Sequence, residues 1–387
     1  MSILDKWGDK MSKKKKKGAQ GFFAKIVMLL IGGICGLAMT LVGAIAFKDN
    51  VGFVSFFVEI AFFVLTYFIH LIIHEAGHLV AGLLSGYEFS SFRVMNLMLV
   101  KENGKIKLKK QSVAGTGGQC LMIPPALNGG DYPVIFYNLG GVIMNLIITA
   151  ISVALAVIFV EIPMIFFVCS MMALSGLVVA LTNGIPLKLG MINNDGSNAR
   201  ELYKNTEAKI AFHNQFMIIG LLSSGVRLRD MDEELFPMPS EEGMQNSISI
   251  SSAVFRENRL MDKGEFDAAL EVINKLTRGK NALIGLYKNL LIADKITILL
   301  LKQENTAMAE KYYTCAEYVA FKKQMGTNIS VLRTDYAYLL LHEKNEGAAS
   351  VALSKFEERA KSHPYKPDIE SEREIIALIN GRYDEIK

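Results

Sequence analysis

Three residues in one short segment have the types and spacing of a hydrolytic metal site: His74, Glu75 and His78. On an α-helix, residues i and i+4 share a face, so the two imidazoles can bind one Zn²⁺. Glu75 then lies beside that face, where its carboxylate can accept a proton from a water whose pKa the cation has lowered to about 7. The segment therefore predicts two metal ligands and one general base.

The setting of this segment strengthens the prediction, because it closes a long apolar run that begins near Val51. Ionisable side chains at bilayer depth are costly and mark a functional site by default. The alternative is that these groups only form hydrogen bonds between helices. The sequence favours chemistry inside a membrane.

A catalytic zinc with two histidines needs one more protein ligand and an open position for water. The carboxylate best placed to supply it is Asp195, in the segment Asn193-Asn194-Asp195-Gly196. The same residues would also suit an ordinary turn, and that alternative stays open.

His70 lies one turn before His74, so His70, His74 and His78 form a stripe on one helix face. Such a histidine can shuttle protons near a metal, but it more often forms a hydrogen bond between packed helices. We therefore do not predict His70 as a ligand.

The chain has 387 residues, of which 51% are hydrophobic, and its final third has a soluble composition. This predicts two unlike parts, one of them in a membrane. The net charge is only +4, and the run Lys13 to Lys17 accounts for more than that, which argues against a nucleic-acid-binding surface. The four cysteines show no paired spacing, so we expect packing roles for them.

Four apolar segments are long enough to span a bilayer. The first follows the lysine run and carries Gly32 and Gly36 at a spacing that allows close helix approach. A cleaved signal peptide ending at Ala44-Ile45-Ala46 is the rival interpretation, but the length of the segment favours a retained anchor. The expected spans are residues 22–47, 51–73 (continuing helically to 84), 134–160 and 164–181.

Lysine and arginine in the loops predict the orientation of the spans. The basic runs lie before the first span and between the second and third, so both regions are expected in the cytoplasm. Four spans then place both termini in the cytoplasm and the His74 segment toward the cytoplasmic leaflet. We expect an integral protein of the cell membrane.

Between residues 87 and 131 the pattern alternates, over 92–97 and again over 106–109, on either side of Asn103-Gly104. Asn-Gly between such runs predicts a β-hairpin. The hairpin is either a simple cytoplasmic loop or an exposed edge that adds a substrate strand.

Beyond residue 200 the chain is expected to leave the membrane. Residues 208–222 are apolar enough to suggest a fifth span, but polar residues at their centre favour a helix on the cytoplasmic face, and a linker follows at 236–243. From about 251 onward, helix pairs recur at roughly forty residues, and residues 263–270 resemble the turn and second helix of a tetratricopeptide repeat. Such an array binds a partner or, alternatively, only caps the membrane part.

The HEAGH segment at the end of a span, Gly141-x-x-x-Asn145 in the next, and Asn183-x-x-Pro186 followed by Asp195-Gly196 after another resemble the site-2 protease family of intramembrane zinc metalloproteases. The resemblance covers about residues 53–196. It implies zinc bound by His74, His78 and Asp195, with Glu75 as the base.

The resemblance also implies substrate contacts by Asn145 and Gly141. Two features depart from the family pattern: Val142 stands where proline is usual, and the stretch from Pro186 to Asp195 is long.

The predicted fold is an all-α polytopic membrane protein with a small β-hairpin insertion and a C-terminal, soluble, tetratricopeptide-like helical-repeat domain. The expected parts are a basic N-terminus (1–21), a transmembrane metalloprotease domain (22–200), an amphipathic helix and linker (201–245), and the helical-repeat domain (246–387).

The predicted function is hydrolysis of membrane-embedded protein segments or signal-peptide remnants with a Zn²⁺ cofactor. The expected partners are a membrane protein or peptide substrate, the lipid bilayer and a protein on the helical repeats. The alternatives are a non-proteolytic scaffold with a structural zinc site and a metal transporter that uses the histidine stripe.

Overall fold

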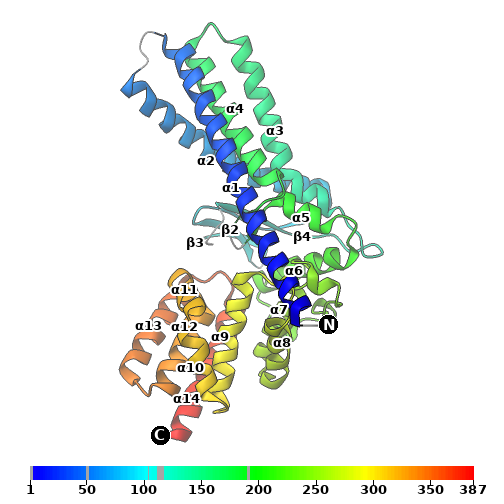
Figure 1. Cartoon of the computed structure of the whole chain (residues 1–387), viewed down its shortest axis with the longest axis vertical. Coiled ribbons are helices and arrows are strands. Elements are labelled where there is room, and N and C mark those ends of the chain that lie inside the picture. The colour runs from blue at the N-terminus through cyan, green and yellow to red at the C-terminus, as the bar shows by residue number, and fades with distance from the viewer. Residues whose placement is uncertain (1–2, 49–51, 103, 111–116, 190–191) are drawn as a thin grey trace. The chain divides into compact units, whose positions relative to one another are not determined.

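The computed structural model of the chain describes all residues except 1–2, 49–51, 103, 111–116 and 190–191 (Figure 1). The contacts divide the chain into two compact units. The first contains residues 1–87, 114–120 and 133–203, and the second contains residues 88–113, 121–132 and 204–387.

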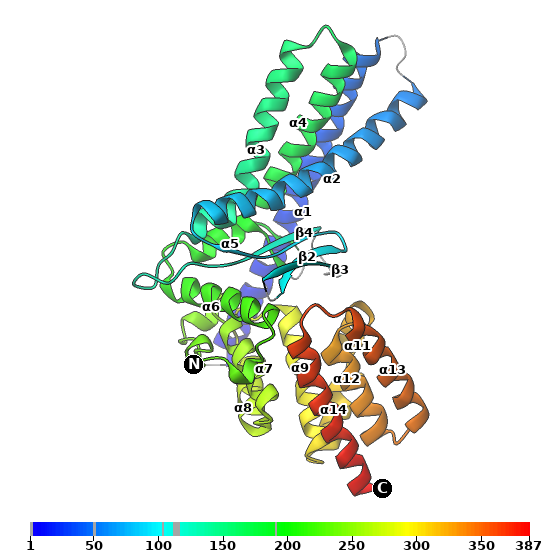
Figure 2. The same ribbon diagram turned by 180° about the vertical axis from the view of Figure 1, so that it is seen from behind.

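The first unit is built on long apolar helices, and within the described residues four helices are long and apolar enough to cross a membrane. The four predicted spans are therefore confirmed in length and apolar composition. α3 packs on both α2 and α4, while α1 packs on α4 (Figures 1 and 2). The helices are α1 (Ile3–Phe47, with its apolar part at Ala24–Phe47), α2 (Phe53–Leu84), α3 (Val134–Ile158) and α4 (Pro163–Gly184). The helical start of α1 at Ile3 means that the basic segment continues into the first span as one helix.

Glycines allow α2 and α3 to touch backbone to backbone at the level of the histidines. A Cβ on Gly77 would lie 2.4 Å from the carbonyl oxygen of Gly140, and one on Gly140 would lie 2.5 Å from that of Gly77. Small residues permit this approach between membrane helices, where packing replaces the hydrophobic effect as the driving force. The contact brings the two helices together at the predicted site.

After α4 the chain forms two short paired strands, β5 (Lys188–Leu189) and β6 (Ile192–Asn193), and then the helix α5 (Asp195–Leu202). α5 packs against both α3 and α4.

The predicted hairpin region forms a four-stranded antiparallel sheet, larger than expected, in the order β3-β2-β1-β4. Its strands are β1 (Glu88–Val94), β2 (Leu97–Glu102), β3 (Lys105–Lys110) and β4 (Gly118–Ile123). β2 and β3 close at Glu102 opposite Lys105, as the hairpin prediction requires, although Asn103 lies outside the described residues.

The predicted single run 92–97 is wrong, because a turn at Met95 and Asn96 divides it between β1 and β2. Met95 has a φ of 56°. A positive φ is uncommon for residues other than glycine, so the sequence did not indicate a turn here.

The rest of the second unit is helical. α6 (Thr206–Ser223) covers the amphipathic segment and is not among the four candidate spans found in the described residues. Gly264, with a φ of 74°, ends α7, and α8 begins two residues later, where the sequence predicted a turn and a second helix. The C-terminal helices are α7 (Ser251–Lys263), α8 (Phe266–Arg278), α9 (Gly285–Leu301), α10 (Thr306–Thr314), α11 (Ala316–Met325), α12 (Ile329–Ala337), α13 (Glu346–Ser362) and α14 (Lys366–Ile386).

Candidate metal centre

α2 and α5 bring together the three predicted ligands of the first unit. His74 Nε2 lies 3.2 Å from His78 Nε2. Asp195 Oδ2 lies 2.9 Å from the first of these nitrogens and 3.4 Å from the second. The three donor atoms therefore form a nearly equilateral triangle at the end of a helix long enough to span a membrane.

This triangle has the dimensions of a metal site. In a tetrahedral site with metal–ligand distances of about 2.0–2.1 Å, neighbouring ligand atoms lie about 3.3 Å apart. Asp195 Oδ2 is buried and lies within reach of both imidazole Nε2 atoms, so either a proton or a cation can fill the space between the three atoms. Three ligand atoms at this spacing suit a cation at the centre. His74, His78 and Asp195 are thus a buried group that could hold a metal ion.

Asn194 places Asp195 at the start of α5. Its Oδ1 accepts the backbone N–H of Ser197 at 3.0 Å, which caps the helix. Its Nδ2 donates to the carbonyl oxygens of Thr182 at 2.8 Å and Ile185 at 2.6 Å, where α4 ends. Sequence reasoning missed this role, although asparagine is a favoured N-cap residue and an acidic residue in the first turn, here Asp195, is typical of a helix start.

Gly196 permits the close packing that holds Asp195 in place. A Cβ on Gly196 would lie 2.1 Å from the carbonyl oxygen of Gly184. Any larger residue would push α5, and with it the Asp195 carboxylate, away from the end of α4.

The environment of Asp195 favours its ionised form. Burial alone would raise the pKa of this carboxyl group, but the His78 and His74 imidazoles outweigh burial and hold the pKa well below its usual range. A metal ion would replace the imidazole protons as the positive charge beside this carboxylate.

Tyr137 on α3 fixes the orientation of His78. Its carbonyl oxygen lies 2.8 Å from His78 Nδ1 and can only accept a hydrogen bond. His78 Nδ1 therefore carries the proton, and the lone pair of Nε2 is free for a metal. The Tyr137 hydroxyl donates to the carbonyl oxygen of Cys120 at 2.6 Å, and nothing in the sequence analysis pointed to this tyrosine.

The structure places Gly141 and Asn145, the residues implied to contact substrate, against the histidines. A Cβ on Gly141 would lie 2.6–2.7 Å from three atoms of the His74 ring. Asn145 is fully buried, and its amide lies between His70 and His74, at 2.9 Å and 3.0 Å respectively. Contact of these two residues with a substrate stays a prediction.

Glu75 is 7% exposed and lies beside the beginning of β4. A Cβ on Gly118 would lie 2.4 Å from Glu75 Oε1, so only glycine allows the strand to pass this carboxylate.

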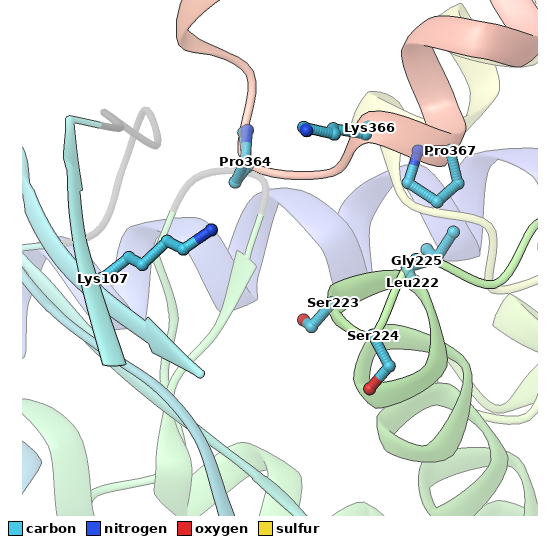
Figure 3. Close-up of a pocket in the computed structure, with 8 residues that line it drawn as sticks. All are labelled: Lys107, Leu222, Ser223, Ser224, Gly225, Pro364, Lys366 and Pro367. Atoms are coloured by element: carbon cyan, nitrogen blue, oxygen red, sulfur yellow. The ribbon is translucent and has the colours of Figure 1, made fainter. Parts of the chain in front are cut away.

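A cavity of about 90 Å³ lies within the second unit (Figure 3). The hydroxyls of Ser223 and Ser224 at its wall already donate to carbonyl oxygens of their own helix. The rest of its lining consists of two lysines, two prolines, Leu222 and Gly225, and none of them is a predicted site residue. The lining contains no histidine, cysteine or carboxylate, unlike the His74 cluster.

Comparisons of the chain with protein-family models, with curated proteins and with solved structures return no match.

Proposed function

We propose that the protein is an intramembrane zinc metalloprotease of the site-2 protease type. The observation that carries the proposal is the triangle of donor atoms from His74, His78 and Asp195, with the Glu75 carboxylate next to it in sequence, on a helix apolar enough to span a bilayer. Two imidazoles and one carboxylate leave a tetrahedral zinc with one open position, as catalysis requires.

The chain's own residues would perform the proton transfers. A zinc ion at this site would lower the pKa of a water molecule and polarise the scissile carbonyl. Glu75 accepts a proton from the attacking water as the new C–O bond forms, and it then delivers that proton to the amide nitrogen as the C–N bond breaks. The approach of the Gly118 backbone restricts the positions open to the Glu75 carboxylate.

The proposed substrate is a membrane-embedded segment of another protein or a signal-peptide remnant, because the site lies at the end of a candidate span. The lysine-rich loops support an orientation with both termini in the cytoplasm of a cell-membrane protein. The C-terminal helical region would then serve as a tetratricopeptide-like array for a protein partner.

Cleavage of a co-expressed single-span reporter, measured together with zinc content, tests the proposal. Wild type should cleave, whereas Glu75→Gln should keep its zinc and lose cleavage by at least about 10²-fold, the usual contribution of a general base. Gln has nearly the size of Glu but cannot accept the proton, so loss of cleavage with retained zinc isolates the chemical role.

Stoichiometric zinc with no dependence of function on Glu75 would instead support a scaffold that has a structural zinc site. A transporter would require zinc flux that survives in Glu75→Gln.

A further inference from the structure

A chain of buried polar groups runs from the metal centre into the helix bundle. Asn145 on α3 bridges two imidazoles of α2: its Oδ1 lies 2.9 Å from His70 Nδ1, and its Nδ2 lies 3.0 Å from His74 Nδ1. Asn145 and His70 are both 0% exposed, so water cannot replace either partner.

The hydrogen bonds between His70, Asn145 and His74 allow two self-consistent placements of the protons. As the amide stands, Asn145 donates to His74 Nδ1, which places the His74 proton on Nε2 and blocks the atom that faces Asp195. Rotating the amide by a half turn exchanges its oxygen and nitrogen with almost no change in shape. Asn145 then accepts from His74 Nδ1–H, and His74 Nε2 has a free lone pair.

The far end of this series of polar groups can also accommodate the second arrangement. When Asn145 donates to His70 Nδ1, the His70 proton must sit on Nε2. That atom is buried and unpartnered among the described residues, and so is the hydroxyl of Thr149. A Cβ on Gly176 would lie 2.7 Å from His70 Nε2 and 2.4 Å from Thr149 Oγ1, so the two unpartnered atoms adjoin the same small space.

We propose that Asn145, His70 and Thr149 are positioning residues that set the tautomer of His74 needed to bind zinc. Occupancy of the metal site is then coupled to the orientation of the Asn145 amide and to the proton on His70. The inference rests on the proposed zinc site, and it gives Asn145 a role in metal binding rather than in substrate contact.

His74 and His78 differ in how firmly their surroundings fix the tautomer of the ring. The carbonyl oxygen of Tyr137 locks His78 in one tautomer, because a carbonyl oxygen cannot donate. His74 instead faces an amide that can donate or accept. Loss of the Asn145 amide should therefore weaken metal binding through His74 alone.

Zinc affinity of the purified full chain, measured by competition with a chelator, tests the inference without any substrate. Asn145→Leu should weaken zinc binding by about 10–100-fold, the usual effect of losing a group that orients a metal ligand. Asn145→Asp should retain the wild-type affinity or exceed it, because a carboxylate can accept from His74 Nδ1–H.

Thr66→Val is the matched control. It removes a buried hydroxyl from α2 one turn before His70, where Thr66 donates to the carbonyl oxygen of Phe62 at 2.9 Å. Its zinc affinity should equal that of wild type. Equal affinities for Asn145→Leu and Thr66→Val would overturn the inference while leaving the protease proposal intact, whereas wild type without bound zinc would overturn both.

Nitrogen NMR of the zinc-loaded wild type, labelled at histidine, observes the tautomers of His74 and His70 directly. The expected spectrum has the His74 proton on Nδ1 and the His70 proton on Nε2, with single-histidine variants assigning the signals. A His70 proton on Nδ1 would contradict the inference.

Discussion

Each unit buries a cluster of ionisable side chains, and the two clusters are built differently. In the first unit the donor atoms of His74, His78 and Asp195 converge within 3.4 Å of one another. In the second unit one guanidinium, that of Arg333, pairs with Asp294 and, through Nε at 3.2 Å, with Glu372. Converging donor atoms could hold a metal ion, whereas charges paired with one another need no ion.

The second cluster also contains an excess of acid. Glu257 is 0% exposed, and both of its carboxylate oxygens lack a hydrogen-bond partner among the described residues. Burial and the nearby Asp294 carboxylate raise the pKa of Glu257 well above its usual range. Burial of charge thus does not by itself mark a site of chemistry, and the geometry of the lone pairs separates the two clusters.

The largest expected effect follows from removing one ligand of the converging cluster. Structural zinc sites gain about 10–16 kcal/mol from their ligands, so Asp195→Ala should cost several kcal/mol of binding and reduce zinc from stoichiometric to trace amounts. Zinc content by mass spectrometry of the purified protein checks this. Asp294→Asn is the control from the paired cluster, and this variant should keep its zinc. Equal loss of zinc in both variants would show that the two clusters do not differ in metal binding.

The next effect belongs to the paired cluster. Arg333→Leu leaves the Asp294 and Glu372 carboxylates buried without a counter-charge, which should destabilise the C-terminal helices by about 3–5 kcal/mol. Hydrogen exchange in α9 and α12 should accelerate accordingly. Arg373→Leu, which removes a half-exposed pair with Glu357, should change stability by about 1 kcal/mol or less. Unchanged exchange in Arg333→Leu would mean that this pairing does not stabilise the fold.

A smaller effect is expected at the edge of the converging cluster. In Gly118→Ala, the new methyl group would displace the Glu75 carboxylate, so reporter cleavage should fall by about 10²-fold while zinc stays bound. Gly33→Ala is the control, because a Cβ there meets nothing within 4 Å. If both variants cleave like wild type, the contact does not position Glu75.

The smallest effect has the opposite sign. Glu257→Gln removes a carboxyl group that must stay protonated in the fold, so it should stabilise the C-terminal helices by about 1–3 kcal/mol near neutral pH. A raised folded-state pKa means that stability is lost as pH rises above the ordinary value for glutamate. The advantage of Gln over Glu should therefore grow between pH 5 and pH 8, as thermal unfolding would reveal; an advantage independent of pH would show that Glu257 does not titrate as inferred.

The parts of the site that lie close together in sequence could be predicted. The i, i+4 spacing places His74 and His78 on one face of any helix, and apolar length alone identifies four helices able to span a membrane. The turn between β2 and β3, which contains Gly104, follows from residue type, whereas the turn between β1 and β2 depends on a positive φ at Met95 that residue type does not indicate.

The contacts that complete the site depend on tertiary packing. α3 is apolar around most of its surface, so its sequence does not reveal that Asn145 and Gly141 face α2. Asn194 caps α5 and also binds the end of α4, and only the second contact fixes where the Asp195 carboxylate points. These contacts join residues up to 75 positions apart, beyond the reach of any local pattern.

X-ray absorption at the zinc edge of the purified wild-type protein tests the central claim most directly, because it reports the ligands of a bound ion. The account predicts stoichiometric zinc with two imidazole nitrogens and oxygen ligands at about 2.0–2.2 Å. Sulfur ligands at about 2.3 Å would contradict it. A protein that contains no zinc after purification and binds none when zinc is added would contradict it as well.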